Sequence, residues 1–114
     1  MKGNFATVVI EHNRAAQQFE AQVDGQLAAI EYGFVGDSLV FTHTEVPKPL
    51  AGHGIANQLA HTALEYARAQ QLPVVPLCPF VARYIRRHPE YQALMDPAFS
   101  ALVQPDEAEA SAHD

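Results

Sequence analysis

The stretch that most constrains this chain is residues 46–56, with the sequence VPKPLAGHGIA. An alternating pattern typical of a strand ends there, a loop of proline and glycine follows, and a helical pattern begins. Gly52 and Gly54 can adopt backbone angles that other residues avoid, and they carry no side chain to obstruct a ligand. Successive N–H groups at such a helix start can converge on phosphate oxygens, although two glycines also serve a plain strand-to-helix turn. The stretch therefore predicts a turn that either holds an anion or only redirects the chain.

Strand patterns precede this turn. Four segments have the β-branched content or the apolar alternation of strands, at residues 7–12, 18–23, 27–35 and 38–46. Asp24-Gly25 is a strong hairpin signal, and Gly36-Asp37 supplies the next turn. Strands joined by hairpins form an antiparallel sheet, and helices must cover one of its faces.

Two helices can follow the turn. Residues 55–70 carry an apolar stripe of helical period, and Pro73 ends that helix. A short apolar strand follows at residues 74–78, and a strand-helix-strand crossover makes it parallel to the fourth strand. A second helix is predicted at residues 80–88, with a further turn at residues 90–95. The predicted fold class is α/β (α+β), with a mixed, mostly antiparallel sheet of five strands and two to three helices.

Length and charge limit what the chain can be. Its 114 residues suit one domain, which we place at residues 1–104, and we expect the acidic, alanine-rich residues 105–114 to be a disordered tail. A net charge of −6 argues against a nucleic-acid surface, which needs Lys and Arg to neutralise phosphates. No apolar run approaches the roughly 20 residues that span a bilayer, and the N-terminus shows no secretion signal. With a single cysteine, the sequence predicts a cytoplasmic protein without nucleic-acid or membrane partners.

Two segments carry a family resemblance. Residues 43–60 read HTEVPKPLAGHGIANQLA, and residues 63–91 read ALEYARAQQLPVVPLCPFVARYIRRHPEY. They resemble the GNAT superfamily of acyl-CoA N-acyltransferases, and more narrowly its short single-domain branch, over about residues 8–94. The resemblance implies that acyl-CoA lies where the fourth and fifth strands splay apart. It also implies that an acetyl group moves from acetyl-CoA to a primary amine.

The acceptor side departs from that of larger relatives, which place two helices after the first strand. Residues 13–17 leave no room for them, so we expect an acceptor side that is unusually open or is completed by another chain or by the substrate. Two functions therefore stay open: an N-acetyltransferase, or a CoA-binding module without turnover that acts through a protein partner. The sequence specifies neither the acceptor nor the oligomeric state.

The resemblance implies a set of CoA-binding residues around the glycine turn. Main-chain N–H groups would cradle the pyrophosphate, and the residues of this cradle are Leu50, Ala51, Gly52, His53, Gly54, Ile55 and Ala56. The backbone of Glu45 and Val46 would pair with the pantetheine arm like an extra strand. The superfamily turn usually begins with Arg or Gln where this chain has Pro49, and Lys48 is near enough to supply the missing charge.

A basic patch lies late in the second predicted helix, where Arg83, Arg86 and Arg87 have the spacing i, i+3, i+4. Cations suit the C-terminal end of a helix, so the patch can be a solvated helix end. The alternative is that Arg83 and Arg87 clamp the 3′-phosphate of CoA. The histidines lack a metal-ligand spacing such as HxxxH, so we predict no metal site.

Cys78 ends the predicted fifth strand just ahead of the second helix. A cysteine in an apolar run is often an inert core residue. The family places a cysteine at this position and implicates it in acyl transfer, so its thiolate would accept the acyl group or its thiol would line the thioester pocket. A helix start favours an anion, and we therefore expect an acyl-cysteine.

Three other side chains are candidates for acid–base chemistry. His43 and Glu45 stand two apart on one strand, so both point to the same face, and either can take the proton of an attacking amine or be an ordinary polar residue at a strand end. In larger relatives a tyrosine on the second helix protonates the departing CoA thiolate. Tyr84 lies close to that position, and a core tyrosine is the alternative.

Overall fold

The computed structural model of the protein describes residues 8–98. Within these residues, five strands, two α-helices and two 3₁₀ helices succeed one another. Their bounds are β1 Ile10–Asn13, β2 Gln18–Val23, β3 Gln26–Val35, β4 Ser38–Glu45, η1 Lys48–Leu50, α1 Ile55–Gln70, β5 Val74–Pro76, α2 Pro79–Arg87 and η2 Pro89–Leu94. The predicted tail and the domain boundary at residue 104 lie outside the described residues.

The five strands form one sheet in the order β1-β2-β3-β4-β5. The first four are antiparallel neighbours, and β5 runs parallel to β4. This confirms the predicted mixed sheet. A hairpin meander explains the antiparallel part, and the crossover through α1 explains the parallel pair.

The parallel pair is short. It begins with Leu39 opposite Val74 and ends with Phe41 opposite Pro76, whereas β4 continues to Glu45. The fifth strand is shorter than predicted because Pro79 suits the first position of a helix, which makes the preceding residue the N-cap of α2. The last four residues of β4 therefore have no strand partner on the β5 side among the described residues.

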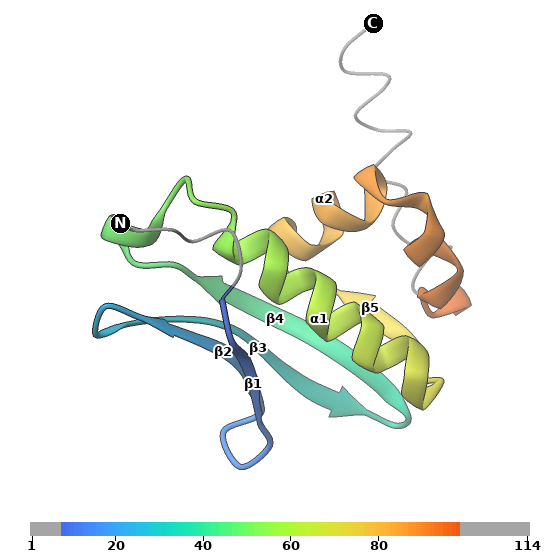
Figure 1. Cartoon of the computed structure of the whole chain (residues 1–114). Helices are drawn as coiled ribbons and strands as arrows, with labels where there is room; N and C mark the ends of the chain where they lie inside the picture. The colour runs from blue at the N-terminus through green and yellow to red at the C-terminus, as the bar shows by residue number, and fades with distance from the viewer. Residues whose placement is uncertain (1–7, 99–114) are drawn as a thin grey trace, which may run out of the picture.

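Helix α1 lies across one face of the sheet, as Figure 1 shows. Its buried residues are Ile55, Leu59, Ala60, Ala63, Leu64 and Ala67, which follow the predicted apolar stripe. They belong to one core cluster with Phe19, Ile30 and Phe41 of the sheet. Phe34 is 48 % exposed, with its ring edge-on to Tyr32, so the predicted apolar alternation of β3 does not bury its last ring.

An irregularity in β4 changes its alternation. Tyr32 of β3 pairs with Phe41, but the preceding residue Glu31 pairs with His43, so Thr42 is an extra residue in the ladder. A bulge of this kind moves every later side chain of the strand to the opposite face. Among the described residues no helix is long and apolar enough to cross a membrane.

Candidate functional site

The glycine turn leads directly into α1. Gly52 and Gly54 have φ of 82° and 78°, in the left-handed region that favours glycine, and Gly54 is the N-cap of α1. No side chain of the part of the chain that the structure describes caps this helix start. The first N–H groups of a helix have no acceptor within it, and together with the helix dipole they suit an anion. The turn is thus built as a place where phosphate oxygens can accept hydrogen bonds.

A hollow of about 310 Å³ opens at this turn, and we call it the turn hollow. Its lining consists of Val46, Leu50, Ala51, Gly52, Gly54, Ile55, Ala56, Asn57 and Phe80. Asn57 and Phe80 are additions to the predicted CoA-binding set, and no sequence motif distinguishes them from ordinary helix residues. His53 and Glu45 are exposed and lie outside this lining.

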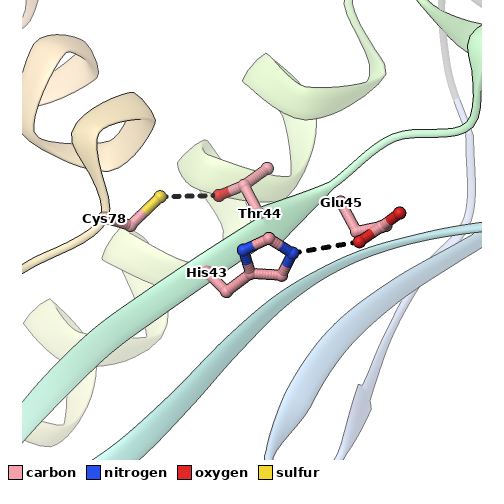
Figure 2. A network of polar contacts seen from close by, with 4 residues as sticks. All are labelled: His43, Thr44, Glu45 and Cys78. Carbon is pink, nitrogen blue, oxygen red and sulfur yellow. Dashed lines mark hydrogen bonds and ion pairs between the residues drawn. The ribbon is translucent and has the colours of Figure 1, made fainter.

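Cys78 is buried at the junction of β5 and α2, with 2 % of its surface exposed. Its backbone N–H donates to the carbonyl of Phe41 at 2.9 Å, and its carbonyl accepts from the N–H of Ala82 at 3.0 Å. Its Sγ lies 3.0 Å from Oγ1 of Thr44 (Figure 2). The thiol is therefore held in place where β4 and β5 stop pairing.

The bulge at Thr42 explains why Thr44 reaches Cys78. Thr44 pairs with Ile30, which is fully buried under α1, and side chains of paired residues lie on the same face of a sheet. Without the bulge, the alternation of β4 would bring its odd-numbered residues to the α1 side. Thr44 thus contacts the candidate nucleophile, and the sequence shows no glycine or other signal of the bulge that puts it there.

His43 and Glu45 lie together on the opposite face of the sheet. Nε2 of His43 is 3.0 Å from Oε1 of Glu45, and Figure 2 shows this contact as separate from that between Thr44 and Cys78. The hydrogen bond to Glu45 is the main cause that raises the pKa of His43 above its ordinary value. The two residues form a pair, as the sequence predicts, but the pair does not contact the thiol.

Tyr84 belongs to an aromatic cluster on α2 and η2. Its ring stacks on His88 with centroids 3.9 Å apart, and the ring of Tyr91 follows at 6.2 Å. Burial raises the pKa of its hydroxyl. Tyr84 lines a different hollow from the one at the glycine turn, and Cys78 lines neither of the two.

The arginines Arg83 and Arg87 are exposed on α2. Arg87 follows Phe80 by seven residues, which places it within about 20° of Phe80 around the helix axis. The face of α2 that lines the turn hollow therefore also carries Arg87, two turns further along. Among residues 8–98 no group of three or more His, Cys, Asp or Glu side chains is arranged to hold a metal ion.

Comparisons with known proteins agree with this architecture. The family model described as GCN5-related N-acetyl-transferase matches residues 18–94. Protein NATD1 of Homo sapiens is 34% identical over 88 residues, which cover 75% of this chain and 78% of NATD1. Protein NATD1 of Gallus gallus is 33% identical over 90 residues, 76% of this chain and 82% of that protein. The solution structure of a GCN5-like protein from Staphylococcus aureus superposes with a TM-score of 0.64 at 26% identity, covering 80% of this chain and 90% of that one.

Proposed function

Because the chain belongs to the GCN5-related N-acetyltransferase family, we propose that it transfers an acetyl group from acetyl-CoA to a primary amine of a small molecule or protein. One observation carries the proposal: the glycine turn at the start of α1 and a positioned thiol both lie beside the end of β4 that β5 leaves unpaired. A turn alone explains only a bound phosphate. A thiol near the same strand end adds a group that can react with a thioester.

The two ends of the site suit the two ends of acetyl-CoA. N–H groups at the start of α1 would donate hydrogen bonds to the pyrophosphate, with Arg83 and Arg87 as the candidate clamp for the 3′-phosphate. The main chain of Glu45, the last residue of the unpaired end of β4, and of Val46 directly after it would hydrogen-bond the pantetheine arm. The acetyl group would then arrive near Cys78.

We expect the reaction to proceed through an acyl-cysteine. Sγ of Cys78 loses its proton and forms a bond to the acetyl carbonyl carbon, the bond from that carbon to the sulfur of CoA breaks, and CoA takes up one proton in exchange and leaves as its thiol. The acceptor amine then attacks the acyl-cysteine, which forms the amide and returns the thiol. The alternative is direct attack of the amine on acetyl-CoA, with His43 or Glu45 as the base and Cys78 as part of the wall.

Intact-protein mass spectrometry after exposure to acetyl-CoA alone separates the two routes. The acyl-cysteine route predicts one added acetyl group on the wild type and none on Cys78→Ala or Cys78→Ser, with turnover abolished in both variants. An unmodified wild type that still releases CoA when an amine is supplied, together with an active Cys78→Ala, would establish the direct route instead.

The second candidate function is a CoA-binding module without turnover. The observation that favours it is the short connection between β1 and β2, residues 14–17, which supplies no acceptor-site helices. Release of free CoA thiol across a panel of amines and lysine-containing peptides distinguishes the two functions. Calorimetric binding of CoA without any release would favour the module, and absence of binding at millimolar CoA would contradict both.

A further inference from the structure

A second hollow, of about 320 Å³, lies over the outer face of α1, and we call it the helix hollow. The residues that line it include Ile10 of β1, Asn57 and His61 of α1, and Tyr84 of α2. Asn57 also lines the turn hollow, so the two hollows adjoin at the first turn of α1. A volume of roughly 300 Å³ is at the small end of the range for ligand pockets.

A hydrogen-bond network fixes the polar group that this hollow offers. The hydroxyl of Tyr91 donates to Oε2 of Glu65 at 2.6 Å, and the same hydroxyl lies 2.9 Å from Nδ1 of His61. The hydrogen bond from Tyr91 to Glu65 is the main cause that lowers the pKa of Glu65. The Glu65 carboxylate is therefore ionised and can only accept hydrogen bonds.

The network also decides the tautomer of His61. Because a hydroxyl has one proton and Tyr91 gives it to Glu65, the Tyr91 oxygen must accept at the second contact, and Nδ1 of His61 must carry the hydrogen. In the neutral ring, Nε2 then holds a lone pair. Within residues 8–98 no group bonds Nε2, and His61 lines the hollow. The helix hollow therefore offers an acceptor to a ligand that has an N–H donor.

We propose that the helix hollow holds the adenine of CoA, with Nε2 of His61 accepting a hydrogen bond from the exocyclic amino group. This inference rests on the proposed function, which places the pyrophosphate at the start of α1. From the start of α1, the pantetheine arm would run towards β4, and the adenosine would extend in another direction. The adjoining helix hollow offers the adenosine the apolar Ile10, the aromatic Tyr84 and the hydrogen-bond acceptor of His61. The adenine amino group carries the N–H donor that this hydrogen bond requires. Arg87 follows Tyr84 by three residues on α2, so it is a surface neighbour of Tyr84 and is available to bind the 3′-phosphate.

Calorimetry with CoA and with 1,N6-etheno-CoA tests the subsite, because the etheno bridge removes the N–H donors of the adenine amino group. One hydrogen bond of ordinary strength predicts that the wild type binds CoA about three- to tenfold more tightly than etheno-CoA. His61→Phe should weaken CoA binding to the etheno-CoA level and leave etheno-CoA almost unchanged. Tyr91→Phe, which keeps the buried ring but removes the hydroxyl that orients His61, should reduce the ratio as well.

Ala69→Phe is the matched control, since it adds the same ring at an exposed position of α1, outside the helix hollow, and should keep the wild-type ratio. Equal affinity of the wild type for the two ligands, or a ratio that His61→Phe leaves intact, would overturn the subsite while CoA binding at the turn stands. If neither ligand binds the wild type, the proposed function falls together with the subsite.

Discussion

The contact between Thr44 and Cys78 allows a quantitative test of whether the thiol reacts. Thr44→Val replaces the hydroxyl, 3.0 Å from Sγ, with a methyl group of similar size. A hydrogen bond to a charged group is worth roughly 1.5–3 kcal/mol, against about 1 kcal/mol for a neutral one. If the sulfur reacts as a thiolate that the Thr44 hydroxyl stabilises, the variant should acetylate Cys78 roughly ten- to hundredfold more slowly.

The assay is the rate at which acetyl-CoA alone adds an acetyl group to the protein, followed by mass spectrometry at saturating acetyl-CoA. Thr44→Ser is the matched control because it keeps the hydroxyl and loses only the methyl group. It should recover most of the wild-type rate. The affinity for CoA should be unchanged in both variants, since Thr44 does not line the turn hollow, and thermal unfolding should shift little because the methyl group replaces the hydroxyl in nearly the same volume.

Two results would refute this reasoning. A Thr44→Val variant that acetylates at the wild-type rate would show that the hydroxyl only fills space beside the sulfur. A loss of rate that Thr44→Ser does not recover would assign the effect to packing. Either result leaves the glycine turn untouched, because the turn and the thiol are separate parts of the site.

Two further predictions concern the opposite face of the sheet and the turn. Because Glu45 raises the pKa of His43, a reaction that uses His43 as the base should accelerate as pH rises through a value above 6.5. Glu45→Gln should move this increase in rate to lower pH. A pH–rate profile that the substitution leaves unchanged would exclude His43 as the base. Gly54→Val should destabilise the fold by about 1–2 kcal/mol, or roughly 4–16 °C in the midpoint of thermal unfolding, because φ is 78°. Gly54→Asn should recover stability, because Asn tolerates this backbone conformation better than Val. It should not recover CoA affinity, since any side chain at residue 54 projects into open space at the turn hollow. An Asn variant with wild-type affinity would contradict pyrophosphate binding by the N–H groups of the turn.

Local patterns along the chain were sufficient to predict most of the fold. The turn signals Asp24-Gly25 and Gly36-Asp37 fall between the observed strands, and the apolar stripe of residues 55–70 matches α1. Turns and helix stripes are encoded by neighbouring residues, so they can be read without tertiary information. The end of β5 was less accessible, because the apolar run continues to Cys78 while Pro79 already begins the next helix.

The sequence by itself determined the glycine turn, the order of strands and helices, and the position of Cys78 at the end of a crossover. Only the tertiary structure decided which neighbours these residues meet. The bulge at Thr42 depends on how β3 and β4 pair, and it turns Thr44 towards the thiol and the pair His43 and Glu45 away from it.

The network around His61 has the same origin. Tyr91 meets Glu65 and His61 only because η2 packs beside α1, 26 and 30 residues away in the sequence. Strand register and contacts of this length arise from packing of the whole core, and no local pattern of residues records them.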